Sequence, residues 1–285
     1  MKRKKIERNL FNLTLGLMVK QPWLQDLNKP LLSLLEECTY ERQQSLLIEL
    51  LSNFEFLDSI KIKQLLERTI SQIFNDWGLS DNNTQIVAMT YDDSADSGQS
   101  LLWSLKPLLA QEDKHPKLVN RVGSAIRHLD QYPNIVLIDE FAGTGSTVTN
   151  RVKQIKADID NVMKNKKWDF EVSIKAIIFV GMESTRNTFE SLNIDYCCFN
   201  WLKKGIAQNY AGVALKKAYK DMLRLESYLA NEVSDKPLPS LGYGRAEALY
   251  YHEGGNLPNS VFPVFWWPKS YTGENRTPLF FRFQK

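Results

Sequence analysis

Hydrophobic residues recur at three- and four-residue spacing through the first part of the chain, with polar and charged residues between them. The pattern is clearest in LLSLLEECTYERQQSLLIELLSNF and KIKQLLERTISQIFNDWG, which are residues 31–54 and 61–78. This spacing places apolar side chains on one face of an α-helix. Gly78 follows the second pattern and suits the end of a helix. The pattern predicts a helical N-terminal extension over residues 1–80, with no strand in it.

After residue 81 the pattern changes to short apolar runs. These runs are QIVAM, NIVLID, IKAIIFVGM and DYCCF, and they begin at residues 85, 134, 174 and 195. The first three each lead into a helical pattern, which indicates buried parallel strands joined by helices. The pattern predicts an α/β core with a parallel sheet over residues 81–233. Ligands are expected beyond the carboxyl ends of its strands.

From about residue 234 the chain is rich in proline, glycine, asparagine and aromatic residues. Such a composition does not suit a long helix, and it carries too many rings for a disordered tail. Residues 234–285 are therefore predicted to form a folded cap of loops and short strands.

The composition is that of a soluble globular protein, with 43% hydrophobic and 24% charged residues among 285. A core can form from this without disulfides or a structural metal. Cys38, Cys197 and Cys198 do not have a metal-ligand spacing, which favours a reducing, cytoplasmic location. The chain has no run of the roughly 18 apolar residues that span a bilayer, so no membrane association is predicted.

The net charge of +3 does not indicate a nucleic-acid partner, although it leaves one possible. The basic residues Lys2, Arg3, Lys4 and Lys5 are interpreted as a solvated terminus.

The apolar run at residue 134 ends in two carboxylates, Asp139 and Glu140, and is followed by small and hydroxyl residues that open a helix. Glycine lets backbone amides approach an anion closely, and a helix N-terminus adds unpaired amides and the positive end of its dipole. The arrangement predicts a phosphate-binding loop with a pair of acids beside it that can bind a diol. The loop residues are Gly143, Thr144, Gly145, Ser146 and Thr147.

The same segment has features of three other kinds of structure. A strand ending in Asp-Glu is also found in nucleoside triphosphatases, but the G-x-x-x-x-G-K-[ST] loop that they need is absent from the chain. A dinucleotide-binding loop needs a third glycine, which is missing. A tight turn without a ligand needs neither the two acids nor the hydroxyl-rich loop.

The segment resembles the PRPP-binding motif of the type I phosphoribosyltransferase superfamily, which has four apolar residues, two acids and T-G-x-[ST]. The resemblance implies a phosphoribosyltransferase-like, Rossmann-like core, PRPP as substrate and Mg²⁺ as cofactor. It implies that Asp139 and Glu140 hold the ribose 2- and 3-hydroxyls, and that residues 143–147 surround the 5-phosphate. Glu140 departs from the second aspartate of many members.

The resemblance also implies a pyrophosphate-binding loop after the first strand. Asp92 and Asp93 in this segment are predicted either to bind Mg²⁺ through oxygen or to form an acidic turn. Residues 111–128 precede the strand at residue 134 and contain Lys114, His115, Lys117 and Arg121. They form either a mobile loop whose basic groups neutralise pyrophosphate or, by preference, a solvated loop and helix. The residues expected to contact pyrophosphate are Ser97, Gly98, Gln99 and Ser100.

In this superfamily a variable hood selects the acceptor, and residues 234–285 occupy its place. The stretches GYGRAEAL, NLPNSVFPVFWW and TPLFFRF resemble the PRTase-CE branch of bacterial conflict and anti-phage systems. Candidate hood residues are Tyr243, Asn259, Trp266 and Trp267. The rings of the three aromatic residues either stack on a base, form a surface that binds a protein, or pack in the hydrophobic core.

The resemblance implies a phosphoribosyltransferase that acts as a toxic effector in antiviral defence. Its acceptor would be a nucleotide, a nucleic acid or a protein. The alternatives are a non-catalytic sensor of PRPP or a nucleotide, and a structural subunit of a larger defence complex. A protein encoded by a neighbouring gene is a possible partner.

Overall fold

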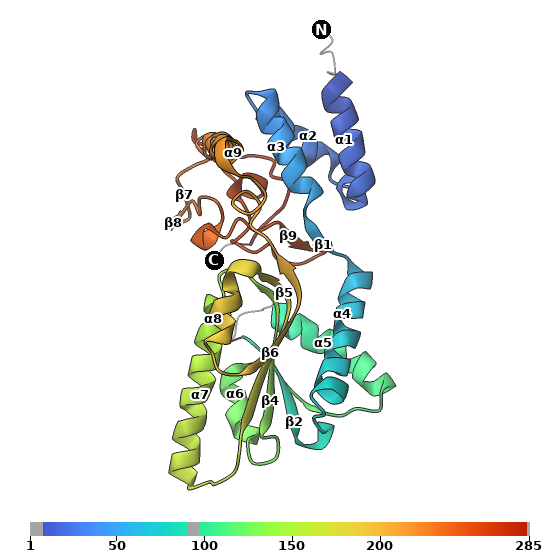
Figure 1. The fold of residues 1–285 in the computed structure, drawn as a ribbon, viewed down its shortest axis with the longest axis vertical. Coiled ribbons are helices and arrows are strands. Elements are labelled where there is room, and N and C mark those ends of the chain that lie inside the picture. Colours follow the sequence, from blue (N-terminus) through green and yellow to red (C-terminus); the bar gives the residue numbers. More distant parts are fainter. Residues whose placement is uncertain (1–7, 91–96, 284–285) are drawn as a thin grey trace. The chain divides into compact units, whose positions relative to one another are not determined.

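The computed structural model describes residues 8–90 and 97–283, shown in Figure 1. Asp92, Asp93 and the basic residues 2–5 lie outside the described residues. The chain divides into two compact units, one formed by Met1–Phe56 with Lys203–Lys285 and the other by Leu57–Leu202. None of the described helices is both long and apolar enough to cross a membrane.

The unit Leu57–Leu202 is built around a parallel sheet whose strand order is β3-β2-β4-β5-β6 among the described residues. This confirms the predicted α/β fold with a parallel core (Figure 1). The strands are β2 (Thr84–Ala88), β3 (Lys117–Val119), β4 (Asn134–Ala142), β5 (Ser173–Met182) and β6 (Asp195–Leu202).

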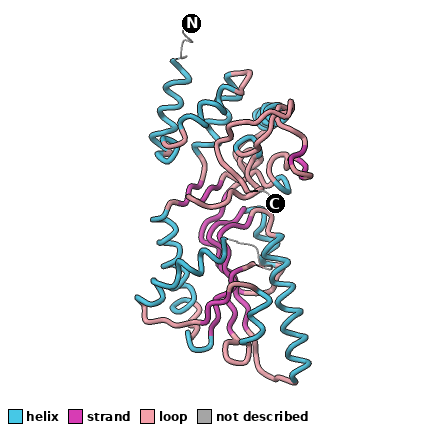
Figure 2. The backbone as a smooth tube through the Cα atoms, turned by 180° about the vertical axis from the view of Figure 1, so that it is seen from behind, coloured by secondary structure: helices cyan, strands magenta, loops and turns pink. Residues whose placement is uncertain are grey.

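Helices cover both faces of this sheet (Figure 2). On one face Val87, Leu137 and Ile178 pack with Val152 and Phe189, and the alternate strand residues are buried on the other face. Burial on both faces explains why the strands are continuous apolar runs. The helices are α4 (Ser59–Ser71) and α5 (Ser97–Gln111) on one side, and α6 (Val122–Ala125), α7 (Ser146–Lys166) and α8 (Arg186–Glu190) on the other.

The segment before β4 differs from its prediction. The sequence favours a solvated loop and helix for residues 111–128, but Lys117–Val119 forms an edge strand parallel to β2. Helix α5 ends at Gln111, and Val122–Ala125 forms a short α-helix. The strand is three residues long and follows Pro116, so it leaves almost no apolar period to recognise. Gly78, by contrast, has a φ of +61° just after the helical segment that ends at Asp76, as the stop signal predicted.

The other unit joins N-terminal helices to the C-terminal segment. A three-residue strand, β1, interrupts the predicted helices and pairs with β9. The helices are α1 (Arg8–Lys20), α2 (Asn28–Glu36), α3 (Glu41–Ser52) and α9 (Gly212–Glu226), and the short strands are β1 (Glu55–Leu57), β7 (Glu232–Val233), β8 (Lys236–Pro237) and β9 (Tyr250–His252).

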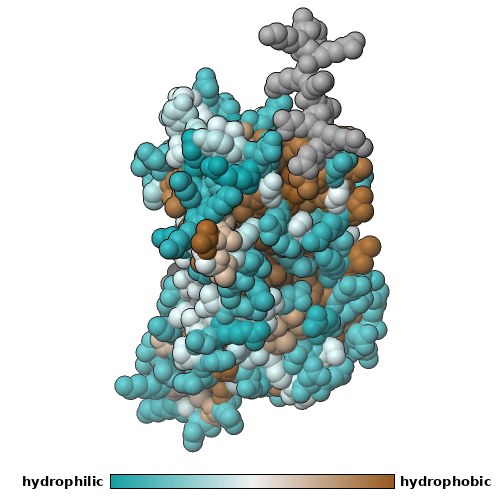
Figure 3. All heavy atoms as spheres, turned by 45° about the horizontal axis from the view of Figure 1, so that its top comes forward, coloured by the Kyte–Doolittle hydropathy of each residue, from teal (hydrophilic) through white to brown (hydrophobic). Residues whose placement is uncertain are grey.

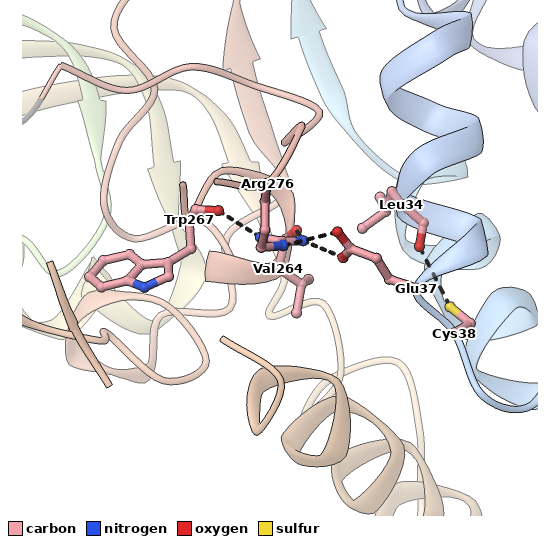
Figure 4. A network of polar contacts seen from close by, with 6 residues as sticks. All are labelled: Leu34, Glu37, Cys38, Val264, Trp267 and Arg276. Carbon is pink, nitrogen blue, oxygen red and sulfur yellow. Dashed lines mark hydrogen bonds and ion pairs between the residues drawn. The ribbon is translucent and has the colours of Figure 1, made fainter. Parts of the chain in front are cut away.

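Arg276 connects the two ends of the sequence inside this unit (Figure 4). Its guanidinium donates to the carboxylate of Glu37, just after α2, and to the carbonyls of Trp267 and Val264. The Arg276 side chain is 5% exposed, so a buried charge is paired and hydrogen-bonded on all sides. Contacts of this kind make one unit of segments that are more than two hundred residues apart.

Candidate phosphate-binding site

The order of the strands places the topological switch point of the sheet between β2 and β4. β2 comes first in the chain within this sheet and continues through α5 to β3, whereas β4 continues through α7 to β5 on the other side. The helices α5 and α7 cover opposite faces, so the chain turns away in two directions from the gap between these strands (Figure 1). Open α/β sheets bind ligands outside the carboxyl ends of their strands at such a point.

The acid pair lies at the carboxyl end of β4, as predicted. Asp139 is half-buried and its Oδ1 accepts a hydrogen bond of 2.8 Å from the amide of Glu140. Glu140 is only 5% exposed. Successive side chains of a strand point to opposite faces, so the two carboxylates leave β4 in different directions. Asp139 is therefore the more accessible of the two.

Gly145 forms the turn between the acid pair and α7. Its φ of +73° and ψ of −3° are left-handed, a conformation that glycine adopts without strain. A Cβ at this position would lie 3.3 Å from Cε1 of Phe189 and 3.4 Å from Cβ of Thr185. The turn is thus packed closely against the segment that follows β5.

The hydroxyls of the loop lie at the start of α7. The Oγ1 atom of Thr144 is 2.9 Å from Oγ of Ser146 and 3.4 Å from its backbone nitrogen. The first turn of α7 contains no acidic residue. Amide and hydroxyl donors and the positive end of the helix dipole therefore meet at one place, beside Asp139.

The residues predicted to contact pyrophosphate form the first turn of α5, and so lie at the start of a helix. This helix begins at Ser97, and Gly98 is buried where a Cβ would lie 3.2 Å from Cβ of Ala88. Gly98 thus lets α5 approach the end of β2 closely, while Gln99 is half-buried and Ser100 is exposed.

Arg151 is a basic residue at this edge that the sequence reasoning missed. It lies on α7, and its Nε donates a 3.1 Å hydrogen bond to the carbonyl of Met89, just after β2. The Thr90 carbonyl accepts a 3.0 Å bond from the amide of Val122. Arg151 therefore places a positive charge near the switch point and fixes the end of β2. Arg151 lies one helical turn after Thr147, and this spacing is the sequence feature that would have placed it near the loop.

The donor set suits a cation held jointly with a substrate. Among residues 8–90 and 97–283 no three His, Cys, Asp or Glu side chains are grouped as a metal site. Mg²⁺ binds through one or two carboxylates together with substrate phosphates and waters, so Asp139 and Glu140 are chemically suitable.

The hood residues differ in exposure. Trp266 and Trp267 are 3% and 1% exposed, and their Nε1 atoms donate to the carbonyls of Val261 and Ala230 at 3.0 and 2.9 Å. Both are core residues of their unit. Tyr243 is 54% exposed, and its amide donates to the carbonyl of half-buried Asn259 at 2.8 Å.

A groove of about 760 Å³ lies elsewhere, between α1, α2 and α3. Apolar residues around it are exposed: Phe11 by 53%, Leu15 by 52% and Leu32 by 51%. Brown residues gather beside the part drawn in grey in Figure 3. This apolar lining does not suit a phosphorylated sugar, so the edge of the sheet remains the candidate site.

Comparison with known proteins identifies the family. A profile of the PRTase-CE family matches residues 35–282. A crystal structure of a hypothetical protein from Neisseria gonorrhoeae with bound ppGpp is similar at 8% identity and a TM-score of 0.30, covering 59% of this chain and 95% of that one. No curated protein matches. Because the profile covers most of both units, the chain belongs to the PRTase-CE family of phosphoribosyltransferase-like proteins.

Proposed function

We propose that this protein binds PRPP, or a related ribose-5-phosphate compound, together with Mg²⁺ at the carboxyl ends of β2 and β4. The observation that supports this most is the left-handed turn at Gly145. It joins Asp139 and Glu140 to the start of α7, whose first turn contains no acidic residue. A phosphate bound by the loop 143–147 would leave the attached ribose next to the acid pair. The family membership gives the same expectation.

In the proposed reaction the bond between the anomeric carbon and pyrophosphate breaks, and an acceptor nucleophile takes the place of pyrophosphate. Asp139 and Glu140 would orient the ribose through its hydroxyls, and the loop 143–147 would anchor the 5-phosphate. Residues 97–100 would lie toward the pyrophosphate. Mg²⁺ would supply charge neutralisation of the phosphates.

The proposed biological role is that of an effector in bacterial anti-phage defence. It rests on the resemblance of the C-terminal segment to a branch of conflict systems and on the family match. The acceptor would be a nucleotide, a nucleic acid or a protein, and a neighbouring gene would supply a protein partner.

Turnover is tested by the release of pyrophosphate from PRPP in the presence of Mg²⁺ and candidate acceptors. The wild type is expected to release pyrophosphate and Asp139→Asn to lose this activity. Asp130→Asn is the matched control, because Asp130 is exposed and lies before β4, at the other end of the strand. PRPP binding without release under any acceptor would favour the non-catalytic sensor. Equal release by Asp139→Asn and the wild type would contradict the proposal.

A further inference from the structure

Basic residues are unevenly distributed along the chain, although the net charge is only +3. Between Lys203 and Arg224 there are six lysines and arginines and one acid, Asp221. Most of them belong to α9, in the unit that also contains the C-terminal segment. The chain therefore contains a strongly basic segment despite its modest net charge.

Three of these basic residues follow one side of α9. Lys216, Lys220 and Arg224 are spaced by four residues, so they form a row with a rise of about 6 Å between neighbours. Lys216 and Lys220 are exposed and Arg224 is half-buried. The row presents positive charge along the helix at regular intervals.

The carboxylates of α9 do not neutralise this row, because they are turned inward and already engaged. Asp221 is 3% exposed, and its Oδ1 accepts a 2.6 Å bond from Nε of Arg42. Glu226 is also 3% exposed, and it accepts bonds from the hydroxyl of Ser240 and the amide of Leu241. The exposed side of the helix is left positive.

An exposed tyrosine lies at one end of the row. The ring of Tyr40 is 37% exposed, and the guanidinium carbons of Arg224 and Arg42 lie 4.6 and 4.3 Å from its centroid. Arginine on an aromatic face adds a cation–π contact and still presents its edge to an anion.

A second exposed tyrosine, Tyr243, lies in the loop 241–247. A hydrogen bond between Tyr219 of α9 and Glu247 joins this loop to the helix. The hydroxyl of Tyr219, between Lys216 and Lys220 on the helix, donates a 2.6 Å bond to Oε1 of Glu247. The loop contains left-handed residues, including Arg245 at a φ of +53°, and it presents Tyr243 and Arg245 to solvent. Non-glycine residues held in this conformation cluster at functional sites, so the loop is a candidate part of a binding surface.

We propose that this face binds single-stranded nucleic acid. The α9 face is defined by Lys216, Lys220 and Arg224 with Tyr40, Tyr243 and Arg245. Its basic side chains contact phosphates, and the exposed ring of Tyr243 stacks on an unpaired base. Tyr40 positions the guanidinium groups of Arg42 and Arg224, which lie over its ring. A single strand fits better than a duplex, because exposed rings stack only on bases that are not already paired. The proposal is independent of PRPP binding at the sheet.

An anionic membrane surface is the competing partner for a basic helix. Interfacial helices bury a continuous apolar face between the lipids. The exposed apolar residues of α9 are Val213 and Leu223, which are 83% and 45% exposed. They are ten residues apart, about 15 Å along the axis, with no other exposed large hydrophobic residue of α9 between them, so α9 lacks a continuous apolar face.

The test is the fluorescence anisotropy of labelled oligothymidylate and oligouridylate with the full-length protein over a series of salt concentrations. The wild type is expected to bind, and Lys216→Glu with Lys220→Glu should weaken binding at least tenfold. The slope of log K against log salt should fall by about 1.4, since each phosphate contact on a single strand contributes about 0.7. If this variant does not fold, Lys216→Gln with Lys220→Gln replaces it.

Matched controls separate local recognition from net charge. Lys153→Glu with Lys164→Glu makes the same charge change at exposed positions of α7 and should leave affinity within about twofold of the wild type. Tyr243→Ala should weaken binding, whereas Trp103→Ala, at a ring 72% exposed on α5, should not. Equal weakening by the two double variants would overturn the proposal. So would a wild type that binds no oligonucleotide, or one that binds only phosphatidylserine vesicles.

Discussion

Two turns of this protein leave backbone amides outside the hydrogen bonds of a helix or strand, and they differ in whether a carboxylate of the chain accepts from those amides. In the unit with the C-terminal segment, the amides of Ile206 and Ala207 both donate to Oε2 of Glu247 at 2.8 Å. Glu247 is 1% exposed. At the start of α7, in the other unit, Gly145 has no side chain and the first turn has no acid. The first turn contains its own anion, whereas the second suits an anion that arrives with a ligand.

An uncapped helix start is not sufficient for this conclusion. The helix α9 also follows a residue, Ala211, that makes no side-chain cap, and it has no acid in its first turn. Ala211, Gly212 and Val213 are exposed, so water satisfies those amides. The start of α7 differs because it lies at the strand switch point, beside Asp139.

The largest expected effect comes from removing the internal anion. Glu247→Ala leaves the amides of Ile206 and Ala207 and the hydroxyl of Tyr219 without their acceptor. An unsatisfied buried donor costs about 1–3 kcal/mol. Ile206 is buried and the other two donors belong to half-buried residues, so we expect the free energy of unfolding to fall by about 2–3 kcal/mol. Urea denaturation measures this.

Glu232→Ala is the control for that change, because Glu232 is exposed on β7. It should alter the free energy of unfolding by less than about 0.5 kcal/mol. If Glu247→Ala is equally mild, the carboxylate does not hold its turn and the comparison with α7 loses its basis.

The next effect concerns the turn that is left open for a ligand. Gly145→Val puts a β-branched residue at a φ of +73°, with its Cβ close to Phe189 and Thr185. We expect PRPP affinity to fall at least tenfold, or about 1.4 kcal/mol, because the amides move. The free energy of unfolding should fall by about 1–2 kcal/mol. Calorimetry and urea denaturation measure the two changes.

Gly123→Val provides the matched control in the same unit. No heavy atom lies within 4 Å of a Cβ at Gly123, which has no left-handed φ. Its PRPP affinity should equal that of the wild type. An unchanged affinity in Gly145→Val would show that this turn does not shape the site.

Much of the turn at Gly145 could be predicted from the sequence, whereas little of the turn around Glu247 could be. The apolar run of β4, its acid pair and the small residues after it are contiguous, so local rules predict strand, loop and helix together. Glu247 acts on amides about forty residues earlier, and no local pattern indicates such a contact. Trp266 and Trp267 show the same limit, because an aromatic residue can be core or surface and only the fold decides.

Helix assignment has a similar boundary between local and long-range information. The spacing of the apolar residues predicts the helix α4. It does not indicate which hydrophobic core this helix packs against. The predicted extension over residues 1–80 includes α4, and in the structure α4 belongs to the unit of the sheet. Packing between segments distant in sequence decides this, and it leaves no periodic signal.

The smallest effect is expected for the rates at which the thiols of Cys38 and Cys198 react with a labelling reagent. Burial and, for Cys38, the charge of Glu37 raise the pKa of Cys38 and Cys198 to about 12. Thiolate is the reactive form, so both should remain protonated and react slowly with a disulfide reagent at about pH 8. Labelling followed by mass spectrometry measures each rate. Raising the pH toward 12 should accelerate both reactions.

The two labelling rates also report on the units separately, because Cys38 and Cys198 lie in different units. Glu247→Ala should accelerate labelling of Cys38 and leave Cys198 nearly unchanged, since the lost contacts belong to the unit of Cys38. Equal acceleration of the two thiols would show that the units open together. Rapid labelling of Cys198 in the native wild type would contradict its raised pKa.

Titration calorimetry in the presence of Mg²⁺ measures whether the protein binds PRPP and whether Asp139 takes part. The account predicts that the wild type binds PRPP, and that Asp139→Asn weakens binding at least tenfold without lowering the free energy of unfolding by more than about 1 kcal/mol. Asp130→Asn should bind like the wild type. A wild type that does not bind PRPP, or an Asp139→Asn variant that binds it equally well, would contradict the account.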